Sequence, residues 1–284
     1  MVRESIVSGM FYDGEKEDLI KQIKQCFTSK FGPGKLPKPI GNKTLFGCIV
    51  PHAGFTFSGM AAAHAYKEIA ESRQPDLFII LGTDHTGIEG TCASADDWSV
   101  PTGIVKNHKD FTKALIANGI KESATNHADE HSIEVQLPFL QFVNKDPKIC
   151  PVTISPDKDY KEIAAIINQT VKETKVKPII IISSDFTHYG INYNYVPFTT
   201  NIKANLYKLD KEAIDKILEL DPEAFLDHIR KTKATICGYN AIAVLLELCR
   251  LNNIKTANLL KYYTSGDVVG DFSSAVGYAS IIFK

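Results

Sequence analysis

Three runs of apolar residues each end in polar, ionisable side chains, and this repeated arrangement restricts the folds open to the chain. The runs cover residues 45–50, 77–81 and 178–182. A short run of apolar and β-branched residues is typical of a strand buried on both faces, as in the parallel sheet of an α/β protein. Amphipathic segments predict helices that pack against such a sheet, at residues 13–29, 109–118, 159–174, 202–219 and 222–231. The sequence therefore predicts an α/β fold.

Other segments extend this prediction. Ser58 precedes alanine-rich sequence and is expected to cap a helix that follows the first strand. Residues 150–154 and 272–283 predict further strands, and residues 92–104 an irregular strand and loop. If the strands at 45–50 and 77–81 are adjacent and parallel, the loops that follow them are neighbours.

Length and composition predict one soluble domain over residues 1–284. The chain is 44% hydrophobic and 23% charged, as in ordinary globular proteins, and its formal net charge is −1. Arginine occurs at only four positions, so recognition of nucleic acid is disfavoured. The N-terminus lacks the apolar core of a signal peptide, and no apolar run is as long as a membrane span. A cytoplasmic protein without membrane contact is expected.

Each of the three apolar runs is followed by a histidine. His52 and His85 follow the first two runs, and His188 follows the third. Cys237 precedes an apolar helix at residues 241–248, where the helix dipole favours a thiolate. Two imidazoles and one anionic ligand suit a mononuclear transition-metal site with open coordination positions. The predicted ligands are His52, His85 and Cys237.

His188 would then act as a general base near the metal, with Asp185 fixing its orientation. Two other interpretations stay open at this point: a Cys237–His188 dyad for nucleophilic catalysis, and a set of unrelated polar residues at strand ends. Asp129, Glu130 and His131 are candidates to line a pocket, although charged loops are more often only solvated surface. The glycine spacings of nucleotide-binding loops are absent, so no nucleotide cofactor is indicated.

Five sequence blocks resemble those of the Memo family, which includes an animal mediator of cell motility and its bacterial and archaeal relatives. They are SGMFY at 8–12, PHAGFTFSG at 51–59, DEHSIE at 129–134, SSDFTHYG at 183–190 and TICG at 235–238. The resemblance covers nearly the whole chain. It implies a three-layer α/β/α sandwich with a mixed, mostly parallel sheet, related to class III extradiol dioxygenases.

The resemblance also bears on the site. In those dioxygenases two histidines and a glutamate hold non-haem iron, and another histidine is the base. By position, His52 and His85 match the metal histidines and His188 the base, whereas Cys237 replaces the glutamate. Thr86 stands where the family often has a second histidine. A softer thiolate makes copper and zinc acceptable as well as the expected Fe(II), and puts ring-opening dioxygenation in doubt.

The resemblance implies a metal-binding protein suited to oxygen-dependent or redox chemistry, with a functional link to a radical-SAM protein. A peptide- or anion-binding module without catalysis and a zinc-dependent hydrolase are the alternatives. Enzymatic activity itself is an open question at this stage.

Overall fold

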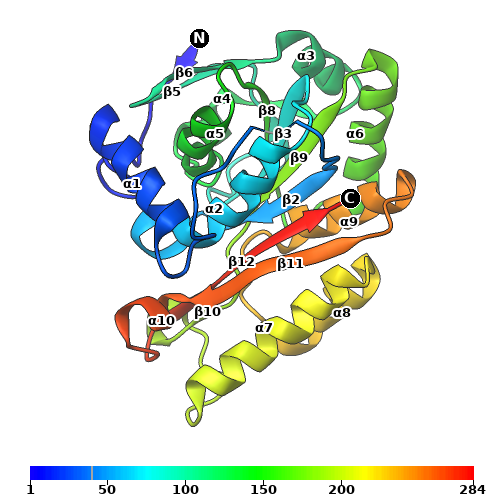
Figure 1. Cartoon of the computed structure of the whole chain (residues 1–284). Helices are drawn as coiled ribbons and strands as arrows, with labels where there is room; N and C mark the ends of the chain where they lie inside the picture. Colours follow the sequence, from blue (N-terminus) through cyan, green and yellow to red (C-terminus); the bar gives the residue numbers. More distant parts are fainter. Residues whose placement is uncertain (40) are drawn as a thin grey trace.

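A mixed sheet of twelve strands runs through the middle of the molecule (Figure 1). The computed structural model describes residues 1–39 and 41–284. The strands are β1 (Val2–Arg3), β2 (Gly47–Val50), β3 (Leu77–Thr83), β4 (Cys92–Ala93), β5 (Asp97–Val100), β6 (Gly103–Asn107), β7 (Lys121–Glu122), β8 (Lys148–Ile154), β9 (Pro178–Ser183), β10 (His188–Tyr189), β11 (Ala257–Thr264) and β12 (Ala275–Phe283).

Ten α-helices and two short 3-10 helices connect these strands in the described part of the chain. The α-helices are α1 (Lys16–Thr28), α2 (Phe55–Glu71), α3 (Lys109–Ala117), α4 (Ala124–Ala128), α5 (Leu137–Val143), α6 (Tyr160–Thr174), α7 (Ile202–Leu218), α8 (Pro222–Thr232), α9 (Tyr239–Leu251) and α10 (Ser265–Val269). The 3-10 helices are η1 (Glu134–Gln136) and η2 (Ile191–Tyr193).

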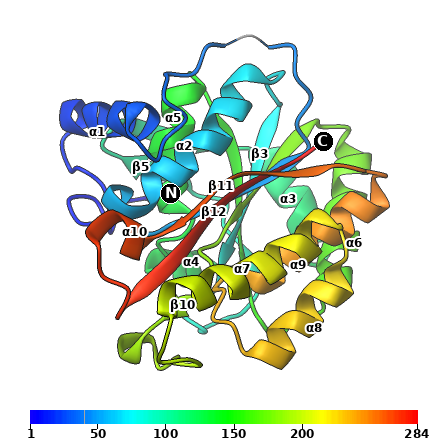
Figure 2. The ribbon, with the colours of Figure 1, turned by 60° about the horizontal axis from the view of Figure 1, so that its bottom comes forward.

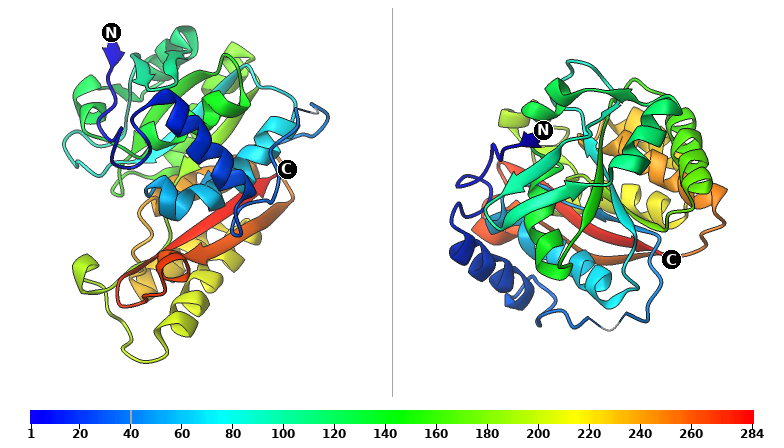
Figure 3. Two further views of the ribbon diagram at one scale, coloured as in Figure 1. Left: turned by 60° about the vertical axis from the view of Figure 1, so that its left-hand side comes forward. Right: turned by 90° about the horizontal axis from the view of Figure 1, so that it is seen from above.

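Helices cover both faces of the sheet, as Figure 3 shows from above. Helices α1, α2 and α5 bury their apolar side chains with one face, and α6 and α9 pack with the other. Every residue of β3 and β12 is buried, which explains why such strands read as continuous apolar runs. The predicted three-layer α/β/α sandwich is confirmed.

The strand order corrects one prediction. The central part of the sheet runs β8-β3-β9-β2-β12, so β9 lies between β2 and β3, which are not adjacent. Strand β9 pairs in parallel with both neighbours, with Ile180 opposite Gly47 on one side and Ile79 on the other. Three parallel strands therefore end at one edge, and the three loops with histidines start there.

The helix boundaries follow the sequence closely, with one exception. Helix α2 begins at Phe55 with Gly54 as its N-cap, so Ser58 is not a cap. It lies within the first turn instead, where its hydroxyl donates a hydrogen bond to the carbonyl of Ala53 at 2.7 Å. The alanine-rich helix was predicted correctly, but its start was placed one turn too late.

The sequence pattern missed β11, which pairs antiparallel with β12. Its first six residues are exposed or half-buried, so it lacks the apolar run that marks the central strands. Helix α7 packs against β11, and α7 and α8 lie together beside the strands near the C-terminus (Figure 2). None of the helices within residues 1–39 and 41–284 combines the length and apolarity that crossing a membrane requires.

Candidate metal site

A cavity of about 490 Å³ opens where β2, β3 and β9 end. Its lining combines histidines and one aspartate with aromatic and small side chains: Phe11, His52, Ala53, Gly54, Phe57, His85, His131, Asp185, His188, Tyr193, Ser265, Val269, Ser274, Val276 and Tyr278. Neither lysine nor arginine is among these residues. The cavity is therefore large enough for a small organic molecule and offers that molecule no fixed cationic side chain.

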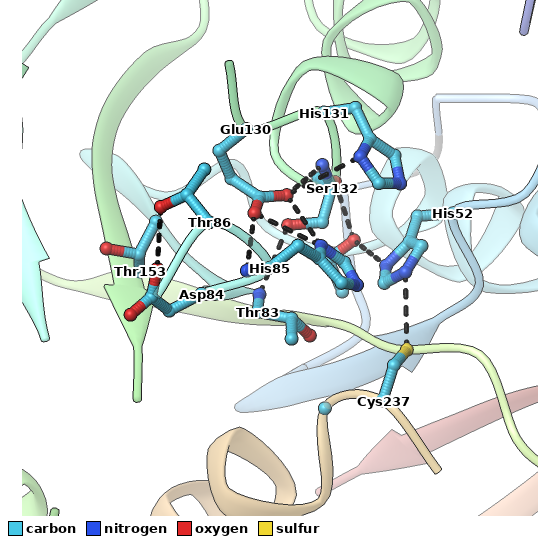
Figure 4. A network of polar contacts seen from close by, with 12 residues as sticks. His52, Thr83, Asp84, His85, Thr86, Glu130, His131, Ser132, Thr153 and Cys237 are labelled. Carbon is cyan, nitrogen blue, oxygen red and sulfur yellow. Dashed lines mark hydrogen bonds and ion pairs between the residues drawn. The ribbon is translucent and has the colours of Figure 1, made fainter. Parts of the chain in front are cut away.

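Cys237 and two of the cavity histidines converge on one point. The donor atoms of His52, His85 and Cys237 all lie within 4.8 Å of one another, and His52 Nε2 is 3.3 Å from Cys237 Sγ (Figure 4). Bonds of about 2.0–2.3 Å to one metal ion place two ligand atoms about 3–4 Å apart. The spacing and the mixed nitrogen and sulfur donors both fit a mononuclear transition-metal ion.

Hydrogen bonds fix the orientation of the His52 ring. Its Nδ1 lies 3.0 Å from Ser183 Oγ, which already donates its only hydrogen to the Ser132 carbonyl at 2.6 Å. Gln136 Nε2 donates to the same Oγ, so this oxygen acts as an acceptor towards the ring as well. Nδ1 of His52 therefore carries the proton, and the lone pair of Nε2 faces Cys237.

Glu130 holds His85 in the same way. The buried carboxylate lies 3.0 Å from His85 Nδ1 and also accepts the backbone N–H groups of His85 and Ser132. Burial lowers the pKa of His85, but hydrogen bonds to Cys237 and Glu130 outweigh burial and raise it. Burial raises the pKa of Glu130, and the bond to His85 outweighs this and lowers it. With Nδ1 bonded to Glu130, His85 directs Nε2 towards Cys237, and a carboxylate behind the other ring nitrogen is common among metal-binding histidines.

Cys237 is placed by a close approach of two chain segments. It directly precedes the N-cap of α9, Gly238, where an added Cβ would lie 2.6 Å from the Cβ of Ser184. The backbone N–H of Asp185 donates a hydrogen bond to Cys237 Sγ at 3.2 Å. The other five cysteines are buried, in agreement with their interpretation as core residues.

His188 lines the cavity, but Asp185 does not orient it as predicted. His188 Nδ1 lies 3.0 Å from the Thr235 carbonyl and donates a hydrogen bond to it, so Nε2 is the free nitrogen. Asp185 Oδ1 accepts the backbone N–H groups of His52 and Ala53, at 2.8 and 3.3 Å. Asp185 thus shapes the loop that carries His52. No local signal in the sequence marks Thr235 as the partner of His188, because the two residues are 47 positions apart.

In the charged loop before η1, some residues lie on the surface and others belong to the site. Asp129 is exposed and does not line the cavity, whereas Glu130 is buried and His131 is half-buried within the cavity wall. Burial is the main cause that lowers the pKa of His131, to about 4, so its ring is neutral at pH 7. His85, Glu130 and His131 form a second group with metal-ligand spacing. Glu130 already accepts several N–H bonds, which favours an orienting role over metal ligation.

Thr86 does not line the cavity. Its hydroxyl forms hydrogen bonds with Asp84 and Asn126. Asn126 also donates to Thr153 Oγ1 at 3.0 Å, so a polar network anchors the loop that carries His85. Thr86 is therefore part of the support for this loop.

Comparisons of the sequence with known proteins point to one family. A family described as Memo-like protein matches residues 3–282. The chain is 39% identical to a MEMO1 family protein of Methanobrevibacter smithii over 100% of both chains. It is 37% identical to one of Methanopyrus kandleri, over 100% of this chain and 99% of that protein.

One solved structure shares the fold. It is an uncharacterized protein from Escherichia coli K12, with a TM-score of 0.53 and 9% identity, over 85% of this chain and 100% of that chain. At this level of identity the likeness concerns the fold alone. The sequence matches span nearly the whole chain at much higher identity, and they show that this chain belongs to the Memo family.

Proposed function

We propose that this protein binds one transition-metal ion between His52, His85 and Cys237 and uses it for oxygen-dependent or redox chemistry on a small molecule. The observation that supports the proposal most directly is the orientation of the two rings. Each directs Nδ1 to a partner, Ser183 or Glu130, and keeps Nε2 free near one sulfur atom. Iron(II) is the metal we expect, and copper or zinc also suit two imidazoles and a thiolate.

The protein's own residues have separate roles in this proposal. The metal would supply Lewis acidity and, if iron or copper, electron transfer. His188 presents Nε2 to the cavity and accepts or donates a proton there, because Thr235 fixes its other nitrogen. The neutral ring of His131 offers a second hydrogen-bonding group to a bound molecule. Phe11, Phe57 and Tyr278 supply aromatic walls that exclude water from it.

Metal analysis tests the ligand assignment. Protein purified without added metal is measured by elemental analysis, alongside His52→Ala, Cys237→Ser and the control His228→Ala. His228 lies on α8, outside the cavity lining. We expect about one metal ion per chain in the wild type and the control, and a strong loss in the other two variants. Full metal content in both His52→Ala and Cys237→Ser would overturn the proposed ligand set.

A zinc-dependent hydrolase uses the same ligands but needs no oxygen. Activity that persists without oxygen in the zinc-loaded protein would favour it over redox chemistry. A binding module for a peptide or an anion is less well supported, because no lysine or arginine lines the cavity. Tight binding of such a ligand after removal of metal by a chelator, without turnover, would favour the module.

A further inference from the structure

A buried carboxylate outside the cavity holds the loop that carries His188. Asp210 on α7 is fully buried, and its Oδ1 accepts hydrogen bonds from both the backbone N–H and the hydroxyl of Thr187. Its Oδ2 accepts from the Tyr262 hydroxyl on β11 at 2.6 Å. Burying a carboxylate is costly, so three donors aimed at one carboxylate indicate a site built to keep it.

The backbone around Asp210 is shaped to admit it. An added Cβ on Gly277 of β12 would lie 2.2 Å from Asp210 Oδ2, so only glycine leaves room for the carboxylate here. The same glycine pairs with the loop on both sides of Thr187: Phe186 N donates to the Gly277 carbonyl, and Gly277 N donates to the Thr187 carbonyl. Helix α7 and strand β12 thus hold Thr187 from two directions.

The residue after Thr187 is the proposed base. The backbone N–H of His188 donates to Thr235 Oγ1 at 2.9 Å, and that hydroxyl donates back to the His188 carbonyl at 2.7 Å. These bonds form only if the Thr187–His188 peptide is held at one orientation. Through Thr187, Asp210 therefore sets the position from which the ring of His188 reaches the cavity.

We propose that Asp210 is a positioning residue for His188: through Thr187 it fixes the loop from which the imidazole reaches the cavity. The proposal rests on the role of His188 in the proposed function. Burial raises the pKa of Asp210 to about 6, although the hydrogen bonds from Thr187 and Tyr262 lower it. The Tyr262 phenol that donates to this carboxylate stays neutral at pH 7, because burial raises its pKa.

The NMR signals of the His188 ring and backbone N–H, recorded in metal-free protein, test the proposal. The signals are assigned with His188→Gln and compared between wild type, Asp210→Asn and the control Asp215→Asn, which alters an exposed carboxylate on the same helix. His52, His85, His131 and Asp185 share the cavity with His188 and are unchanged in all three, so their influence cancels. We expect Asp210→Asn to move the ring signals of His188 while those of His131 stay in place, and to raise hydrogen exchange at the His188 backbone N–H roughly fivefold, whereas Asp215→Asn changes neither.

Unchanged ring signals and unchanged exchange at His188 in folded Asp210→Asn would overturn the proposal and leave the carboxylate a structural role only. If that variant does not fold, Thr187→Val removes one donor to Asp210 and keeps the charge. Hydrogen exchange at the His188 backbone N–H should then rise roughly fivefold, the effect of losing one net hydrogen bond. An unchanged exchange rate would contradict the proposal. Both readouts use metal-free protein, so their failure is distinguishable from failure of the metal assignment.

Discussion

Glu130 and Asp129 are neighbouring carboxylates. Variants of the two residues test whether Glu130 acts by orienting the proposed metal ligand His85 or only through its negative charge. Glu130 is buried against His85 Nδ1, and Asp129 is exposed. We predict that Glu130→Gln weakens zinc binding by about 10–100-fold, the usual effect of removing a carboxylate behind a histidine ligand. Competition with a chromophoric chelator measures the affinity. Asp129→Asn is the matched control, and equal affinities in all three proteins would refute the orienting role.

The same two variants also test how the metal affinity depends on pH. A metal binds the unprotonated ring, so the raised pKa of His85 makes protons compete with metal at neutral pH. The apparent affinity of the wild type should rise with pH through the neutral range. In Glu130→Gln the rise should be complete at lower pH, because loss of the carboxylate removes one cause of the raised pKa. Asp129→Asn should follow the wild-type curve.

At the scale of single residues, the sequence indicated the proposed metal donors but not the residues that form hydrogen bonds with them. His52, His85 and Cys237 could be proposed because each stands at the end of a strand or the start of a helix, positions that short patterns reveal. Glu130, Ser183 and Thr235 could not be assigned as partners. Their roles depend on hydrogen bonds between residues 45, 131 and 47 positions away, and such pairings require the tertiary fold.

Among the helices and strands, α9 allows a testable prediction, because the position of its N-terminus determines the position of Cys237. The Cβ of Gly238→Ala would lie within 2.6 Å of Ser184, so the start of the helix must move away from the β9 loop. Such overpacking costs about 1–3 kcal/mol of stability, and the shift of Cys237 should also weaken metal binding. Thermal unfolding and zinc competition measure the two effects. Gly14→Ala, where the new Cβ would meet only ordinary contacts at 3.5 Å, is the control. Unchanged metal affinity in a folded Gly238→Ala would show that this contact does not position the sulfur.

The elements themselves were largely predictable, and the exceptions have physical causes. The buried central strands form continuous apolar runs, and the amphipathic helices have a clear helical period. Strand β11 has no such pattern, because it lies at an edge of the sheet with much of its surface exposed. The insertion of β9 between β2 and β3 left no local trace either. Three similar apolar runs give no information about which of them is in the middle.

For the whole molecule, a buried ion pair between Arg3 and Glu134 joins the N-terminal segment to η1. Glu134 is fully buried and accepts hydrogen bonds from Arg3 Nη1 at 2.6 Å, from the Tyr12 hydroxyl at 2.6 Å and from the backbone N–H groups of Ile6 and Val7. Next to Tyr12, Phe11 forms part of the cavity wall and packs against the ring of His131. The stability of the fold and the shape of the cavity thus depend on the same contacts.

We therefore predict that Glu134→Gln lowers the free energy of unfolding by about 3–5 kcal/mol, because it leaves Arg3 buried without its anionic partner. Urea denaturation measures the change, and Glu122→Gln, an exposed position on β7, should change it by less than about 0.5 kcal/mol. The hydrogen exchange of Ile6 and Val7 should rise at the same time, since an amide presents only one acceptor oxygen to four donors. If Glu134→Gln unfolds at the same urea concentration as wild type, the segment is held by its apolar contacts alone.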